Sequence, residues 1–139
     1  MSTLRKIQVT ALVLFTLLFI ECDSDHRFNC EFALCTEEFR AIVVSLKHKN
    51  DSTAIALTGY TVIRVSDNQD ITIPDNNLTD NNGYYPITND TKVDLFKFKN
   101  IEVEFTGYVN KAILIQKRFI ITADCCHISL VEGDPKIFL

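Results

Sequence analysis

The sequence predicts an all-β fold, an antiparallel β-sandwich of about seven or eight short strands. Three observations favour it. Apolar residues after position 22 recur mostly at every second position, which is the period of a strand with one buried face. Short segments rich in Asp, Asn and Gly separate these stretches, as turns do. No window after residue 22 repeats its apolar residues with a helical period.

The alternation places the strands along the whole of the later chain. We expect them at residues 39–47, 54–66, 71–73, 84–88, 101–106, 112–123, 126–130 and 137–139, and residues 93–98 are a further candidate. The first has apolar side chains on both faces, which predicts a strand covered on both sides. In the second, the apolar face follows the odd positions from Ile55 to Val65, and Gly59 interrupts it as at a bulge or kink.

The clearest strand with one buried face covers residues 101–106. Ile101, Val103 and Phe105 alternate there with Glu102 and Glu104. We expect the three apolar side chains in the core and the two carboxylates on a solvated outer face. A turn should follow at residues 107–110.

An Asp/Asn-rich segment at residues 67–92 should form turns or an edge hairpin away from the core, since 11 of its 26 residues are Asp or Asn. A calcium loop of the EF-hand type needs Gly at its sixth position. Counting from Asp75 the sixth residue is Asp80, and counting from Asp80 it is Tyr85. Ordinary turns therefore explain this segment better than a calcium site.

The N-terminus has the order of an export signal. Arg5 and Lys6 precede the uncharged apolar run of residues 9–20, which is too short to span a membrane but fits a signal peptide. We therefore divide the chain into a signal peptide at 1–21, a polar tether at 22–38 that begins with an anchor cysteine, and a single β-sandwich domain at 39–139.

Cys22 directly follows the apolar run, and this placement resembles a bacterial lipoprotein signal, in which the cysteine carries the lipid. Glu21 stands where such signals usually have a small residue. Residues 23–25, Asp-Ser-Asp, resemble the acidic stretch after the anchor cysteine in envelope lipoproteins of Bacteroidetes. Cleavage without lipid, followed by secretion or a periplasmic location, is the alternative.

Four further segments extend this resemblance: CTEEFRAIVVSLK at 35–47, YTVIRV at 60–65, GYYPITND at 83–90 and ADCCHISLVEG at 123–133. Together they resemble small uncharacterised envelope lipoproteins of Bacteroidetes. The layout is also similar to carboxypeptidase-regulatory-like and prealbumin-like sandwich domains, so we expect an immunoglobulin-like or a prealbumin-like sandwich. The resemblance implies a sandwich at the outer membrane or cell surface, and it brings neither an active site nor a cofactor.

Four cysteines remain after Cys22, namely Cys30, Cys35, Cys125 and Cys126. An even number in an oxidising compartment predicts disulfides, and four cysteines can pair in three ways. If the adjacent pair lies in a strand, its two side chains point to opposite faces and each meets a different partner. We expect the late pair to lie close to the early pair and to be oxidised.

The alternative is a small metal-binding or redox protein that uses Cys30, Cys35, Cys125, Cys126 and His127. These are soft ligands, but their spacings differ from the CxxC pairs of structural zinc sites. We therefore expect no metal and no cofactor. His127 by itself is more typical of a partly exposed strand histidine than of a catalytic group.

No catalytic motif is present: the sequence has no GxSxG, no HExxH and no glycine-rich phosphate loop. The formal net charge of −4 argues against nucleic-acid binding. We expect an exported, lipid-anchored, non-catalytic domain with a binding or structural role at the cell envelope. Its expected partners are the membrane, through the lipid on Cys22, and a protein or glycan that the sequence does not specify.

Overall fold

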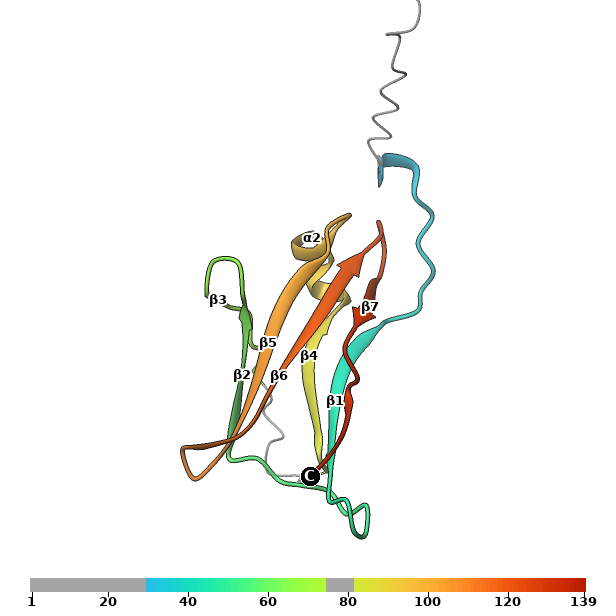
Figure 1. Cartoon of the computed structure of the whole chain (residues 1–139). Helices are drawn as coiled ribbons and strands as arrows, with labels where there is room; N and C mark the ends of the chain where they lie inside the picture. The colour runs from blue at the N-terminus through green and yellow to red at the C-terminus, as the bar shows by residue number, and fades with distance from the viewer. Residues whose placement is uncertain (1–29, 75–81) are drawn as a thin grey trace, which may run out of the picture.

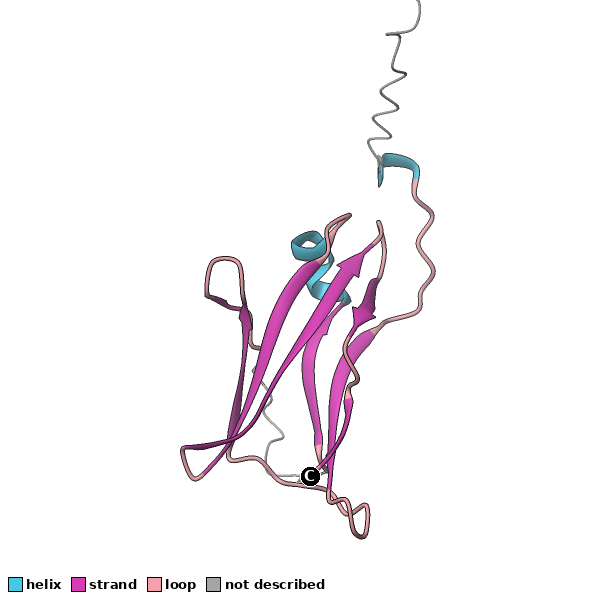
Figure 2. Ribbon diagram, viewed as in Figure 1, coloured by secondary structure: helices cyan, strands magenta, loops and turns pink. Residues whose placement is uncertain are grey.

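Two β-sheets packed face to face make up the computed structural model, which describes residues 30–74 and 82–139 (Figures 1 and 2). One sheet has three strands in the order β4-β1-β8, and the other has five in the order β3-β2-β5-β6-β7. The expected β-sandwich is confirmed. The predicted signal peptide and Cys22 lie outside the described residues, as do Asp75 and Asp80, from which the calcium-loop positions were counted.

The strands are short except in the β5–β6 hairpin. Their bounds are β1 Ala41–Lys47, β2 Gly59–Arg64, β3 Gln69–Asp70, β4 Tyr84–Asn89, β5 Ile101–Val109, β6 Ala112–Ala123, β7 Ile128–Glu132 and β8 Lys136–Phe138. The helical elements of the described chain are η1 Cys30–Phe32, η3 Asp90–Lys92 and α2 Val93–Phe96. All strand pairs are antiparallel except β1 with β8, which run parallel.

The β5–β6 hairpin is longer than the sequence predicted. Val109 pairs with Ala112, and the turn consists of Asn110 and Lys111, whose φ angles are 48° and 69°. Two consecutive residues with positive φ form the tight turn that matches the twist of a hairpin. The turn expected at residues 107–110 is therefore wrong, because residues 107–109 continue β5.

The core lies between the two sheets, and three aromatic rings mark its centre. Tyr60 stacks on Phe105 with ring centroids 5.6 Å apart, and Tyr85 lies 5.8 Å from Tyr60. The buried hydroxyl of Tyr85 donates to the Ile55 carbonyl at 2.8 Å and accepts from the Leu57 N–H at 2.7 Å. This tyrosine therefore holds the irregular segment before β2 against the core.

The first strand is covered on one face only, contrary to the sequence-based expectation. Ile42, Val44 and Leu46 are buried, whereas Phe39 precedes the strand and is 63% exposed. The reason is architectural, since the three-stranded sheet packs one of its faces against the five-stranded sheet. An apolar pattern on both faces does not distinguish this arrangement from a strand between two layers.

The second strand was expected to bury its odd positions, and this expectation is wrong after Gly59. Ile55 and Leu57 are buried as expected, but they lie in the loop before β2. Within β2 the buried residues are Tyr60 and Val62, at even positions. The buried face changes by one position near Gly59, where the strand begins, so that Tyr60 joins the aromatic cluster.

Two other short segments differ from the prediction. Residues 93–98 were a candidate strand, but Val93–Phe96 form one turn of helix, α2, from which Val93 and Phe96 are buried. The Asn89 side chain accepts from the Thr91 N–H at 3.0 Å and starts this helical segment. Residues 71–73 were expected to be a strand, but β3 ends at Asp70 and residues 71–73 follow it as a loop.

The phase predicted for the fifth strand is largely confirmed. Val103 and Phe105 are fully buried and Glu102 is exposed. Ile101 is only partly buried. Glu104 is half-buried, because its carboxylate accepts from Gln116 at 2.7 Å and from the Arg118 Nε at 2.9 Å. The bounds of the strand at 112–123 are confirmed. Within the described residues, no helix is long and apolar enough to cross a membrane.

One buried hydroxyl generates a stability prediction. Thr88 in β4 is 1% exposed, and its Oγ1 has no hydrogen-bond partner among the described residues. Thr88→Val keeps the shape and removes an unsatisfied polar group, so it should raise the free energy of unfolding by about 1 kcal/mol. Chemical denaturation measures this change.

The control for this prediction is Thr72→Val. The Thr72 hydroxyl accepts from the Val62 N–H at 2.8 Å and donates to Asp70 at 2.5 Å, so this variant should lose about 1 kcal/mol. A loss of stability in Thr88→Val as large as that in Thr72→Val would show that Thr88 has a partner after all.

Candidate functional site

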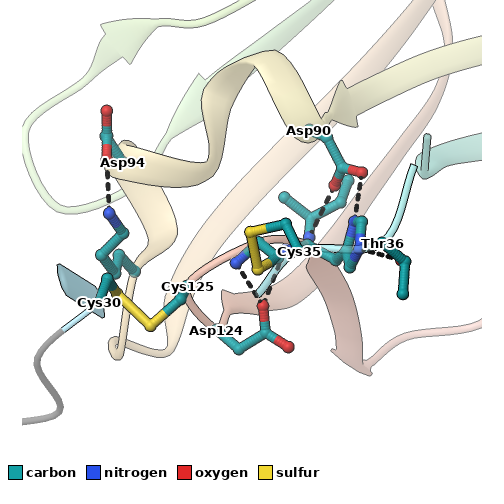
Figure 3. Close-up of a disulfide and its surroundings, with 11 residues drawn as sticks. Cys30, Cys35, Thr36, Asp90, Asp94, Asp124 and Cys125 are labelled. Carbon is teal, nitrogen blue, oxygen red and sulfur yellow. Dashed lines mark hydrogen bonds and ion pairs between the residues drawn. A yellow bond between two sulfur atoms is a disulfide. The ribbon is translucent and has the colours of Figure 1, made fainter. Parts of the chain in front are cut away.

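Both pairs of cysteines meet at one end of the sandwich. Cys30 is bonded to Cys125 and Cys35 to Cys126, each with a Cα–Cα distance of 5.4 Å (Figure 3). We call residues 30–40, which run from the first disulfide to β1, the strap. The expectation that the late cysteines lie close to the early ones and are oxidised is confirmed.

Cys125 and Cys126 do not lie in a strand, although the sequence pattern placed Cys126 in one. They occupy the loop of residues 124–127 between β6 and β7, which we call the cysteine loop. Asp124 folds it: the Asp124 Oδ1 accepts from the N–H groups of Cys126 and His127, each at 2.7 Å. An aspartate commonly closes a turn in this way. These two backbone hydrogen bonds lower the pKa of the Asp124 carboxyl below its ordinary value.

His127 is buried at 8% exposure and precedes β7, so the expected partly exposed strand histidine is wrong. Its Nδ1 lies 2.8 Å from the Asp90 Oδ2, and its Nε2 lies 3.0 Å from the Thr36 Oγ1 of the strap. A carboxylate can only accept, so Nδ1 carries the proton and donates to Asp90. Both ring nitrogens are therefore engaged.

Asp90 joins three segments of the chain (Figure 3). Its Oδ2 accepts from the Arg40 N–H at 2.7 Å, and its Oδ1 accepts from the Ile128 N–H at 2.9 Å. Burial by itself raises the pKa of this carboxyl, but the hydrogen bonds from His127, Ile128 and Arg40 outweigh it and lower the pKa below its ordinary value. The Asp90 carboxylate, 10% exposed, is thus a largely buried anion held by donors from the strap, the cysteine loop and β7.

The order hydroxyl, imidazole, carboxylate in Thr36, His127 and Asp90 is that of a hydrolase triad. A triad also needs backbone donors that are free to bind a developing oxyanion. Here the nearby N–H groups of Cys126, His127, Ile128 and Arg40 already donate to Asp124 or Asp90. The arrangement therefore stabilises the strap on the domain.

Sequence reasoning missed Thr36 and Asp90. Asp90 lies in the Asp/Asn-rich segment, where it looked like one more turn residue, and Thr36 lies in the predicted polar tether. The only local signal was the hydrophilic character that both share with their neighbours. Their role depends on His127, which lies 91 positions after Thr36 and 37 after Asp90.

The two disulfides also argue against the alternative of a metal site at these cysteines. All four cysteines of that proposed cluster are in disulfides, and a metal needs thiolates. The described part of the chain contains no group of three or more His, Cys, Asp or Glu side chains arranged to hold a metal ion.

An open groove of about 780 Å³ lies between the strap and the end of β6. Its apolar wall consists of Ala33, Leu34, Phe98 and Ala123. The cysteine loop and Thr122 contribute polar lining. The groove is therefore a place where an apolar group could contact both the strap and the sandwich.

No protein-family model, no curated protein and no solved structure matches this chain. The arguments for its function consequently rest on its own residues and their geometry.

The two disulfides should not contribute independently to stability. Either bond alone closes a loop of more than 90 residues, and the second then closes only a small ring. Removing one disulfide, for example with Cys35→Ser and Cys126→Ser together, should lower the free energy of unfolding by about 2 kcal/mol in the chain-entropy model. Removing both should lower it by about 7 kcal/mol.

Denaturant unfolding of the wild type, the two double variants and the quadruple variant measures this difference. If the two single-disulfide losses add up to the loss in the quadruple variant, the disulfides act on separate loops and the topology described here is wrong.

Asp90 generates a pH prediction. Because the native pKa of its carboxyl lies below the ordinary value of 3.8, Asp90 contributes stability that is fully present above that value and is lost as the pH falls through the native pKa. Asp90→Asn should lower the free energy of unfolding by about 2 kcal/mol at neutral pH. The difference from the wild type should shrink below about pH 4.

Asp94→Asn is the matched control, since Asp94 is 95% exposed and pairs only with Lys97 in the described chain. It should change stability by less than about 0.5 kcal/mol at any pH. The same pH dependence in both variants would contradict the role assigned to Asp90.

Proposed function

We propose that the chain is an exported, lipid-anchored, non-catalytic β-sandwich domain with a binding or structural role at the cell envelope. The lipid is carried by Cys22, and the domain lies at the outer membrane or the cell surface. The order of charged and apolar residues before Cys22 supports the export, and the resemblance to envelope lipoproteins of Bacteroidetes supports the location.

The observation that carries the proposal is the pair of disulfides between the strap and the cysteine loop. Disulfides persist in oxidising compartments, which an exported chain reaches. Their position also suits an anchored protein, because Cys30 lies only eight positions after Cys22. A pull on the anchor would act on the sheet containing β6 and β7 through covalent bonds, and the strap could not peel away.

The surroundings of His127 support a structural role. The backbone N–H groups beside it already donate to Asp124 or Asp90, so they are not free to bind a developing oxyanion. The His127 ring is buried, and through its contacts with Asp90 and Thr36 it attaches the strap to the domain.

Metabolic labelling tests the anchor. Cells given labelled palmitate should incorporate it into the wild-type protein, and the labelled protein should sediment with membranes. Cys22→Ser should abolish the label, because no other cysteine follows the apolar run directly. Cys30→Ser with Cys125→Ser is the matched control and should keep the label, since it also removes cysteines but spares the anchor.

Two outcomes would contradict the anchor. Equal labelling of wild type and Cys22→Ser would place the lipid elsewhere. An unlabelled wild-type protein whose mature form is found free outside the cytoplasm would favour the secreted or periplasmic alternative.

A further inference from the structure

The strap exposes two large apolar side chains. Phe32 is 86% exposed and Leu34 is 98% exposed, although burying apolar side chains of this size favours the folded state. Isolated apolar residues on a surface are common, but these two lie two positions apart on one short segment. The exposure therefore needs a physical cause and suggests a use.

The cause is the pair of disulfides. Cys30 and Cys35 are both fixed to the cysteine loop, and only four residues lie between them. A segment tied at both ends over this short span cannot swing Phe32 or Leu34 into the core between the sheets. The covalent geometry thus holds both side chains at the surface.

The neighbouring groove extends this apolar surface. Leu34 lines it together with Ala33, Phe98 and Ala123. Phe98 is 42% exposed and has a φ of 55°, a left-handed conformation that bulky residues rarely adopt. Its N–H donates to the Ala123 carbonyl at 2.8 Å, so the fold holds this ring at the rim of the groove.

We propose that Phe32 and Leu34 insert into the interfacial region of the lipid bilayer that carries the anchor, an inference that rests on the proposed function. Cys30 lies eight positions after Cys22, and a fully extended chain over eight positions spans at most about 28 Å. The lipid would keep the strap end close to the bilayer at high effective concentration. The C-terminus lies at the opposite end of the sandwich (Figure 1).

The charges near the strap indicate the kind of bilayer. Glu31, Glu37 and Glu38 belong to the strap, where Arg40 pairs with Glu38 at 3.0 Å, and Asp124 directly precedes Cys125. Carboxylates therefore outnumber basic groups on the strap and at its disulfides. Anionic headgroups would repel these carboxylates. We therefore expect closer contact with a zwitterionic phosphatidylcholine surface than with one rich in phosphatidylglycerol.

The chain contains no tryptophan, so a single introduced tryptophan reports its own surroundings. Phe32→Trp places the probe on the strap. Phe138→Trp is the matched control, since Phe138 is 52% exposed near the C-terminus. The full mature protein is reconstituted in phosphatidylcholine vesicles with and without brominated acyl chains. The Phe32→Trp emission should shift to the blue and be quenched, and the Phe138→Trp emission should not change.

Each result is decisive. Quenching only in Phe32→Trp supports the inference, as does its weakening when phosphatidylglycerol is added. Absence of quenching in the lipidated protein overturns it and leaves the anchor intact. A blue-shifted Phe32→Trp emission before vesicles are added also overturns it, because a second copy or another protein then covers the strap.

The proposed lipid anchor and the proposed contact of the strap with the bilayer can be disproved independently of each other. If palmitate labelling shows that the mature chain carries no lipid, the proposed anchor is wrong. The same variants are then titrated with phosphatidylcholine vesicles. A blue shift confined to Phe32→Trp still supports the strap as a membrane-contacting surface, and its absence overturns the inference.

Discussion

The Asp90 carboxylate is the interaction on which the rest of this end of the molecule depends. It accepts hydrogen bonds from the backbone of Arg40 and Ile128 and from the His127 ring, so it joins the start of β1, the cysteine loop and β7. An anion largely removed from water is costly unless donors surround it, and here three segments far apart in sequence supply them. The strap can dock only where this site has formed.

Disulfides and a side-chain hydrogen bond both hold the strap on the domain. The disulfides of Cys30 and Cys35 fix the ends of the apolar stretch, and the Thr36 hydroxyl adds a contact to His127. Because the strap is held so tightly, its apolar side chains stay in solvent. The feature that stabilises the N-terminal end of the domain thus also keeps Phe32 and Leu34 exposed.

Local patterns predicted the strands well where a long hairpin reinforced them. Val103 and Phe105 are buried as their alternation indicated, and β6 has the expected bounds. Short segments were less predictable, since Val93 and Phe96 are compatible with either a strand or one turn of helix. The change of buried face near Gly59 depends on the aromatic cluster around Tyr60, which is a tertiary contact.

The sequence by itself determined the all-β class, because alternating apolar residues separated by turn formers can bury their side chains only as paired strands. It also predicted that the four later cysteines would be oxidised, from their even number and from the expected export of the chain. Only the tertiary structure decided how they pair and that His127 is buried between Asp90 and Thr36. Those contacts join residues up to 95 positions apart, and no local spacing records which distant segments the sandwich brings together.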